Sequence, residues 1–400
     1  MTRTTMTQIP QIISVDDHLI EPPGVWQDRL PAKYRDVGPR IEEHPNNAFV
    51  VQDGRYVPNP GADGPPAAWW HYEDKYYPVI RYVASAGYPP SAEDSKAIAL
   101  DDMRPGCWQP QARLDDMTVN GVEASLCFPN YPRFCGQIFN EAEDHDLGLL
   151  CVKAYNDFTV DEWCAGSGGR LIPLCLIPLW DPELAAAEVR RNAARGVRAV
   201  AFSELPSWIG LPSIYSGYWD PFFQACDETG TVICMHIGSG TKTLQTSPDA
   251  PGVVSTVMIF ANSSASMVDF LMSGVLERYP NLKLLYAECQ IGWIPFVLER
   301  ADDAWRTHLW AHAEPMITGM PSDYYKDRVY SCFFKDVVGI DLLDRIGVDQ
   351  VLFETDYPHM DGTWPHTHEV AGELFGHLDR VSVDKIARGN AIELLDLPFT

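Results

Sequence analysis

The stretch that most constrains this chain is Ile12–His18, which reads IISVDDH. It is an apolar, β-branched run of strand length that ends in an aspartate, one residue and a histidine. Successive side chains of a strand point to opposite faces, so Asp16 and His18 are expected to project together at the C-terminal end of the strand. A carboxylate beside an imidazole can hold a divalent metal, but short Asp-x-His strings also arise by chance. The prediction gains weight only if later strands end in matching ligands.

A regular alternation of strand and helix follows along the rest of the chain. The strand-like runs are short and apolar throughout, as is typical of parallel strands that are buried on both faces. Eight such repeats predict an α/β fold of the (β/α)8 TIM-barrel type. An open doubly wound sheet is the alternative, but it would normally carry a glycine-rich turn after its first strand. The eight strands are expected to begin at Ile12, Val122, Leu171, Val197, Val232, Leu282, Val329 and Val351.

Helical segments between the strands are predicted from their spacing and end signals. Residues 141–164 carry apolar side chains at helical spacing. Asp181, Pro182 and Glu183 form a helix start, with an N-cap before a proline and an acid in the first turn. Further helices are expected over 219–228, 253–278, 293–312 and 339–346, and two more after the eighth strand.

Residues 22–110 interrupt the alternation directly after the first strand. The segment is rich in proline, glycine and aromatic residues, including Trp69, Trp70, Tyr72 and Tyr76, and its periodicity is poor. We therefore expect an irregular insertion inside a single domain that spans residues 1–400. The insertion either covers the barrel rim or forms a lid or subunit contact that supplies apolar walls to a pocket.

Metal-capable side chains recur where later strands end. His236 closes the fifth strand, although a lone histidine in an apolar strand is more often a satisfied core residue. Asp356 follows the eighth strand, although an aspartate there can simply cap the next element. Chemistry in a TIM barrel sits at the C-terminal ends of the strands, so both residues would meet Asp16 and His18 at one face. Two carboxylates and two imidazoles suit Zn²⁺ or Mn²⁺ and leave a position for water or substrate.

With these motifs in place, the chain resembles the amidohydrolase superfamily, in its aminocarboxymuconate-semialdehyde decarboxylase-like branch, also called amidohydrolase 2. The resemblance implies a metal-dependent TIM barrel with one divalent metal, Zn²⁺ or Mn²⁺, at Asp16, His18, His236 and Asp356. It also implies a homodimer or larger homo-oligomer. The matching stretches are VDDHLIEP at 15–22, MHIG at 235–238, AECQIGWIP at 287–295 with LER at 298–300, and TDYPH at 355–359.

Two departures from the family pattern bear on the chemistry. Many members open with His-x-His, whereas Asp16 stands at the first position here, as an acid does in several decarboxylases of the branch. Many members also carry a histidine at the end of the sixth strand, where this chain has Glu288. Glu288 is a general acid if a dry pocket raises its pKa, or else an acceptor that orients a ligand histidine.

Three functions are compatible with these residues. The first is non-oxidative decarboxylation of a small aromatic or unsaturated carboxylic acid, with Glu288, Asp356 or His359 delivering a proton to carbon. The second is hydrolysis of an amide, ester or lactone, in which a metal-bound water attacks and Asp356 accepts its proton. The third is a ligand-binding barrel without catalysis, but such proteins tend to lose metal ligands, and all four are present.

Composition excludes several classes of partner. Lysine and arginine total 30 against 55 aspartates and glutamates, a net charge of −25 that repels nucleic acid and acidic membrane surfaces. The N-terminal segment lacks an apolar signal region, and no long apolar run predicts a membrane span. None of the ten cysteines forms a Cys-x-x-Cys pair. These features predict a cytoplasmic, reduced protein, and the family resemblance implies that it acts on a small carboxylated molecule.

Overall fold

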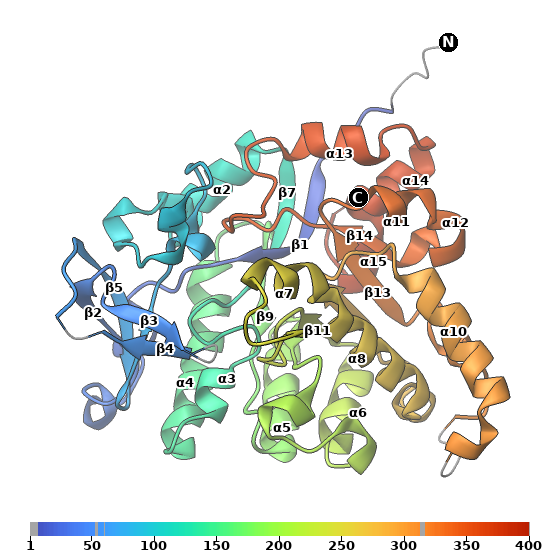
Figure 1. The fold of residues 1–400 in the computed structure, drawn as a ribbon, viewed down its shortest axis with the longest axis horizontal. Helices are drawn as coiled ribbons and strands as arrows, with labels where there is room; N and C mark the ends of the chain where they lie inside the picture. Colours follow the sequence, from blue (N-terminus) through green and yellow to red (C-terminus); the bar gives the residue numbers. More distant parts are fainter. Residues whose placement is uncertain (1–6, 53–54, 60, 313–316, 400) are drawn as a thin grey trace.

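A closed ring of parallel strands forms the centre of the computed structural model, which describes residues 7–52, 55–59, 61–312 and 317–399 (Figure 1). The strands pair in two runs, β1-β7-β8 and β9-β10-β11-β12-β13-β14. The ring closes where the backbone N–H of Asp356 donates to the carbonyl of Asp16 at 3.0 Å. The barrel strands are β1 (Ile12–His18), β7 (Val122–Phe128), β8 (Leu171–Ile172), β9 (Leu174–Cys175), β10 (Ala199–Ala201), β11 (Val232–His236), β12 (Leu284–Ala287), β13 (Val329–Phe333) and β14 (Val351–Phe353).

The predicted TIM-barrel fold is confirmed, and the differences lie in the lengths of strands. The third strand begins at Leu171 as expected, but it consists of the two short pieces β8 and β9 on either side of Pro173. Proline has no N–H to donate to a neighbouring strand, so pairing is interrupted there. The fourth strand is likewise shorter than its apolar run, because Ala199–Ala201 pairs with β11 and only Ala199 and Val200 also pair with β9.

Helices surround the barrel, as the sequence predicts. Where residues 141–164 were expected to form one helix, the chain turns first, and Asp144 then caps a helix that begins at His145 by accepting from the N–H of Leu147 at 2.9 Å. The helices are α1 (Gly24–Gln27), α2 (Pro110–Val119), α3 (Gln137–Asn140), α4 (His145–Phe158), α5 (Pro182–Ala193), α6 (Asp220–Thr229), α7 (Gly252–Met258), α8 (Phe260–Met272), α9 (Val275–Arg278), α10 (Ile294–Thr307), α11 (Val337–Asp341), α12 (Leu343–Ile346), α13 (Thr367–Phe375), α14 (Arg380–Asp384) and α15 (Asn390–Leu395).

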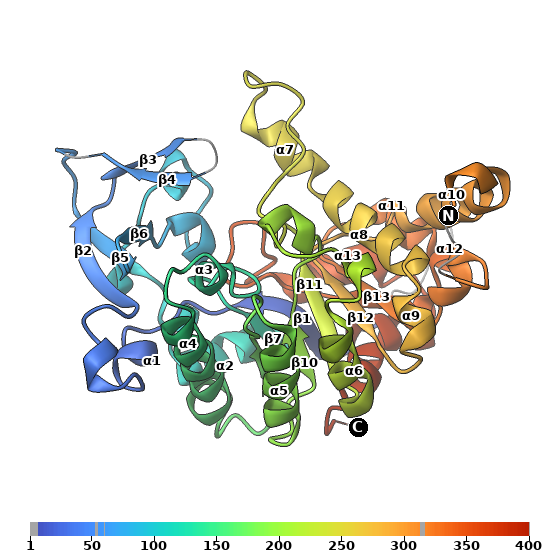
Figure 2. The same ribbon diagram turned by 90° about the horizontal axis from the view of Figure 1, so that it is seen from below.

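The segment 22–110 is more regular than expected. It contains a three-stranded antiparallel sheet, β2-β5-β6, and a two-stranded sheet, β3-β4, which lie to one side of the barrel (Figures 1 and 2). The expectation of an irregular loop was therefore wrong. The central strand reads PAAWWHY and is buried on both faces, so it lacks the alternation that marks a half-buried strand. The strands are β2 (Arg40–Pro45), β3 (Phe49–Gln52), β4 (Arg55–Pro58), β5 (Pro66–Tyr72) and β6 (Lys75–Pro78).

Aromatic side chains join these sheets to the barrel. Trp70 of β5 stacks on Tyr131, which follows β7, with ring centroids 4.6 Å apart. Trp26 packs edge-on against Trp70 at 5.0 Å, and its indole N–H donates to the carbonyl of Cys151 in α4 at 3.1 Å. All three rings are almost fully buried. The insertion therefore shares the hydrophobic core of the barrel rather than hanging from it by a linker.

One helical segment of the described residues is long and apolar enough to cross a membrane by length and composition. It is Gly252–Met272, which joins α7 and α8 and has a mean hydropathy of 1.3. One such segment is weak evidence of a membrane span, since helices that pack on the core of a soluble protein pass the same test. In Figure 2, α7 projects beyond the ring of barrel helices.

Candidate metal centre and active site

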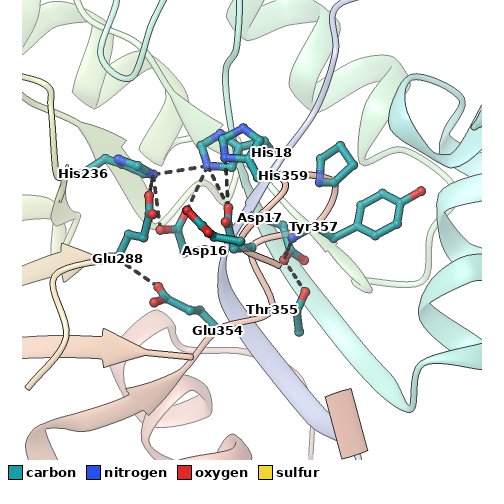
Figure 3. Close-up of polar contacts among 12 residues, drawn as sticks. Asp16, Asp17, His18, His236, Glu288, Glu354, Thr355, Tyr357 and His359 are labelled. Carbon is teal, nitrogen blue, oxygen red and sulfur yellow. Dashed lines mark hydrogen bonds and ion pairs between the residues drawn. The ribbon is translucent and has the colours of Figure 1, made fainter. Parts of the chain in front are cut away.

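Side chains from strands that are far apart in the sequence converge at the C-terminal end of the barrel (Figure 3). The Nε2 atoms of His18 and His236 are 3.2 Å apart. His18 Nε2 lies 3.6 Å from Asp16 Oδ1 and 3.6 Å from Asp356 Oδ1. His236 Nε2 lies 3.4 Å from Asp16 Oδ2 and 3.3 Å from Glu288 Oε2. The structure thus brings all four sequence-predicted metal ligands together, with Glu288 beside them.

The two histidines are presented as neutral donors. The N–H at Nδ1 of His236 donates to the carbonyl of Ile237 at 2.7 Å, which leaves the lone pair of Nε2 facing the cluster. Burial lowers the pKa of His236 to about 3 and holds the pKa of His18 well below its usual range. Neutral imidazole nitrogens of this kind are common metal ligands.

The carboxylates of the cluster fit a cation. Both oxygens of Asp16 and both oxygens of Asp356 are buried without a hydrogen-bond partner. Burial raises the pKa of each carboxyl well above its usual range, and neighbouring carboxylates raise them further. Unpaired buried carboxylates are costly, and a divalent cation would satisfy them. Ligand atoms of Asp16, His18 and His236 lie within 4.8 Å of one another, which is compatible with one shared ion.

Glu288 and Glu354 form a second pair of acids beside this cluster. Glu354 is fully buried, and its Oε2 accepts from the backbone N–H of Glu288 at 3.0 Å and from Cys332 Sγ at 2.6 Å. This bond anchors Glu288 in a left-handed backbone conformation with a φ of 58°, which non-glycine residues seldom adopt. Burial raises the pKa of Glu288 well above its usual range and that of Glu354 to about 8. Glu354 therefore positions Glu288, a role that the sequence analysis missed.

The third predicted catalytic residue, His359, lies on the other side of the cluster. Its ring stacks on that of His18 with centroids 3.7 Å apart, and its Nδ1 is 3.0 Å from Asp356 Oδ1. Burial lowers the pKa of His359 to about 3, so the ring is neutral near pH 7. A neutral imidazole is a weak proton donor, which favours Glu288 over His359 for that role.

Asp17 is a buried residue of β1 that supports the site, and this role was also missed from the sequence. Its carboxylate accepts from Ser14 Oγ at 3.0 Å, Thr355 Oγ1 at 2.5 Å and the N–H of Tyr357 at 3.0 Å, and also from Ser125 Oγ. These bonds tie β1 to the segment after β14, so Asp16, His18 and Asp356 are held in register. The only signal in the sequence is an acid at the strand position that alternates away from the two ligands.

A buried arginine lies next to this support. Arg113 of α2 is 1% exposed, and its guanidinium donates to the carbonyl of His18 and to that of Gly106, the latter at 2.7 Å. It also covers the ring of Tyr357 at 4.3 Å. The positive charge lowers the pKa of Asp17, although burial raises it more. Arg113 thus fixes the strand ends that carry the ligands.

Comparisons with known proteins agree with this geometry. Among curated relatives, gamma-resorcylate decarboxylase of Polaromonas sp. is 26% identical over 332 residues, covering 78% of this chain and 94% of the relative. The 2-amino-3-carboxymuconate-6-semialdehyde decarboxylase of Dictyostelium discoideum is 23% identical over 304 residues, covering 73% and 77% of the two chains. Both relatives are decarboxylases of small carboxylic acids by name.

Solved structures share the fold. An amidohydrolase from Mycobacterium avium subsp. paratuberculosis superposes with a TM-score of 0.68 at 20% identity, covering 96% of this chain and 99% of its own. A dihydroxybenzoic acid decarboxylase from Polaromonas sp., solved with manganese and the inhibitor 2-nitroresorcinol, has a TM-score of 0.60 at 18% identity, covering 80% and 94%. The second structure shows that this fold can carry manganese.

The family itself is established by a match along most of the sequence. The family model described as amidohydrolase matches residues 66–397. This range contains His236, Glu288 and Asp356, and the strand with Asp16 and His18 completes the same barrel. The chain belongs to the amidohydrolase family.

Proposed function

We propose that this protein is a metal-dependent carboxy-lyase that removes the carboxylate of a small aromatic acid as CO₂. One observation carries the proposal: the unpartnered buried oxygens of Asp16 and Asp356 face the Nε2 atoms of His18 and His236. The cluster lies next to a carboxyl group, Glu288, whose side chain is 14% exposed and therefore reachable from outside. The decarboxylase names of the curated relatives support the reaction type.

Asp16, His18, His236 and Asp356 are the residues that would hold Mn²⁺ or Zn²⁺. Such a cation supplies positive charge that attracts the substrate carboxylate and offsets charge that develops as the bond breaks. The chain's own residues would fix the position of that charge. The carbonyl of Ile237 holds the ring of His236. The hydrogen bonds of Asp17 hold the end of β1, which carries Asp16 and His18. Full burial of Asp16, His18 and Asp356 keeps water away from the ligand atoms.

Glu288 is the proton donor in this mechanism. The bond between the ring carbon and the carboxylate breaks, its electron pair stays on the ring carbon, and CO₂ leaves. The ring carbon then takes the proton of the Glu288 carboxyl, whose pKa is raised by burial and by the neighbouring carboxylates. Asp356 would hold the cation, and burial lowers the pKa of His359 to about 3, so neither side chain competes well for this role. A proton from solvent restores Glu288.

The reaction is tested by identifying the product. Manganese-loaded protein is incubated with 2,6-dihydroxybenzoate and 5-carboxyvanillate, substrates by name of decarboxylases with this fold, and with amides, esters and lactones of aromatic acids. We expect CO₂ to be released from an acid. Release of amine or alcohol without CO₂ would show instead that the cluster serves hydrolysis, with Asp356 as proton acceptor.

Variants of the cluster connect the activity to the site. His236→Ala and Asp356→Asn are expected to lose turnover and metal together, whereas His308→Ala, a histidine at the end of α10 outside the site, should keep both. Full activity in His236→Ala or Asp356→Asn would refute the proposal. A protein that binds metal yet turns over no acid, amide, ester or lactone would support a ligand-binding barrel instead.

Glu288→Gln separates proton donation from metal binding. Glutamine keeps the size of the side chain but has no acidic proton, so turnover is expected to fall by about 10² to 10⁴. Metal content should stay at the parent level, because Glu288 is not one of the four proposed ligands. Equal losses of metal and turnover would make Glu288 a ligand rather than the donor.

The assembly and the role of the insertion are also proposals. We expect a homodimer or larger homo-oligomer, with residues 22–110 acting as a lid or subunit contact of a single 1–400 domain. Light scattering of the purified protein measures the assembly directly, and a monomer at micromolar concentration would contradict the expectation.

A further inference from the structure

One tyrosine of the insertion is fastened to the loop that carries Asp356. The backbone N–H groups of Ser85 and Ala86 donate to the carbonyl of Pro358 at 2.9 and 3.2 Å. In the opposite direction, the N–H of Met360 donates to the carbonyl of Tyr82 at 3.1 Å. These three bonds fix the backbone at Tyr82 against the active-site loop, although the two segments are far apart in the sequence.

The side chain of Tyr82 borders the metal centre. Its ring centroid is 6.1 Å from that of His359, within the range of aromatic contact. Burial raises the pKa of the phenol, and the negative charges of Asp361, Glu288 and Asp356 raise it further, so the hydroxyl is close to the acids of the site. The residue is nevertheless 37% exposed. Tyr82 is therefore an exposed residue at the border of the cluster, and the side chain of Glu288 is also partly exposed.

The hydrogen bonding of Tyr82 restricts what it can recognise. Its hydroxyl donates its single proton to Asp361 Oδ2 at 2.8 Å. A phenol has one proton and two lone pairs, so with that proton engaged only the acceptor side of the oxygen remains. A substrate group that meets this oxygen must donate a hydrogen bond. An ether oxygen at the same place would leave the lone pairs of both oxygens facing each other.

We infer that Tyr82 is a specificity residue that accepts a hydrogen bond from a hydroxyl or amino group on the ring of the substrate. The inference rests on the proposed function, because it takes the substrate to be an aromatic acid whose carboxylate faces the metal centre. It narrows the substrate class to acids that carry a ring donor and disfavours those in which that donor is methylated.

The test compares pairs of ligands that differ by one methyl group. Dissociation constants of manganese-loaded protein are measured for benzoates with an ortho, meta or para hydroxyl and for their methoxy counterparts. At one ring position the parent protein should prefer the hydroxyl form by about tenfold more than Tyr82→Phe does. Using the ratio of two ratios cancels direct effects of the substituent on the metal.

Two further variants make the test specific. Tyr88→Phe is the matched control, because Tyr88 lies in the same insertion, is also 37% exposed and donates its proton to the carbonyl of Asp102 at 2.6 Å. Its ligand preference should equal that of the parent. Asp361→Ala should reduce the preference for hydroxyl over methoxy ligands although Tyr82 is retained, because the freed phenol can then donate to a methoxy oxygen. Metal content is expected to be the same in all four proteins.

The outcomes separate this inference from the proposed function. If the parent binds the benzoates but Tyr82→Phe keeps the parent's preference, or Tyr88→Phe loses it equally, the role of Tyr82 is refuted and the carboxy-lyase proposal stands. If the metal-loaded parent binds none of the ligands, both are refuted.

Discussion

At the scale of the residue, the carboxylate of Asp17 accepts more hydrogen bonds than that of the proposed ligand Asp16 beside it. It is buried and accepts from four donors on β1, on β7 and beyond β14. A carboxylate can satisfy this number of donors because it has about four lone-pair sites. No neutral side chain of the same size can do so.

Asp17→Asn tests how much these hydrogen bonds contribute to stability and to metal binding. The amide nitrogen would face donors and leave at least one of them unpaired, so the free energy of unfolding should fall by about 2 kcal/mol or more. Metal affinity should fall as well, because β1 and the segment after β14 lose their link. Chemical denaturation and metal titration measure the two effects. Asp115→Asn on the exposed side of α2 is the control, and equal stability of the two variants would contradict the account.

Glu21 makes the stability depend on pH. Burial raises the pKa of Glu21 from 4.5 to about 7, although the N–H groups of Tyr131 and Asn130 donate to its carboxylate and lower it. A raised folded-state pKa means that the folded state binds the proton more tightly. The stabilisation by the protonated Glu21 carboxyl is therefore complete below about pH 4.5 and is lost as the pH rises through about 7. The free energy of unfolding falls by at most about 3 kcal/mol over this range.

The pH prediction is checked with Glu21→Gln, which cannot titrate. Unfolding free energies of the parent should decline more steeply between pH 4.5 and 7 than those of the variant. Some slope should remain in the variant, because burial also raises the pKa of Glu204 to about 7. Identical slopes in the two proteins would show that Glu21 does not titrate in this range.

At the scale of the element, the insertion and the loop after β14 behave as one unit. The N–H groups of Ser85 and Ala86 both converge on the carbonyl of Pro358. Ser85→Pro removes one donor and disfavours the helical backbone of Ala84 before it. Hydrogen–deuterium exchange should then become faster in the loop 355–362 as well as in the insertion.

The control for this change is Ala92→Pro, at the first position of the short 3-10 helix Ala92–Ser95. Proline is tolerated there, and the preceding Ser91 already has an extended backbone. Exchange in the loop 355–362 should be unchanged in that variant. Faster exchange in both variants would mean that the insertion is generally labile rather than anchored at Pro358.

Elements also show where sequence reasoning succeeds and fails. The run ending in Asp16 and His18 predicted both its strand and the face on which the two side chains meet His236 and Asp356, because strand geometry alone decides it. The sheets of the insertion were missed because β5 is buried on both faces and so shows no alternation. Glu354 was missed because its partner, the backbone N–H of Glu288, is far away in the sequence and comes close only when β12 and β14 are assembled in the barrel.

At the scale of the whole molecule, the site is a place where function opposes stability. Asp16, Glu288, Glu354 and Asp356 bring four carboxyl groups into the buried end of the barrel, in a chain whose net charge is already −25. Burial and mutual repulsion raise the pKa values of these groups. A bound cation would relieve this cost and stabilise the fold by its binding free energy.

This opposition predicts that one substitution has opposite effects with and without metal. In the presence of a chelator, Asp356→Asn should melt at or above the Tm of the parent, because one of the buried, mutually repelling acids is gone. With excess Mn²⁺ the parent should gain several degrees, and the variant should gain little. Thermal denaturation under both conditions measures the difference. A lower Tm of the variant in chelator would show that Asp356 stabilises the fold without a cation.

The most direct test of the central claim is elemental analysis of the parent and His236→Ala, purified side by side after growth with added manganese and zinc. The account predicts about one divalent metal ion per parent chain and a large loss in the variant, because His236 Nε2 faces Asp16 and His18. Parent protein without bound metal, or equal metal in the two proteins, would contradict the claim that these buried side chains form a metal centre.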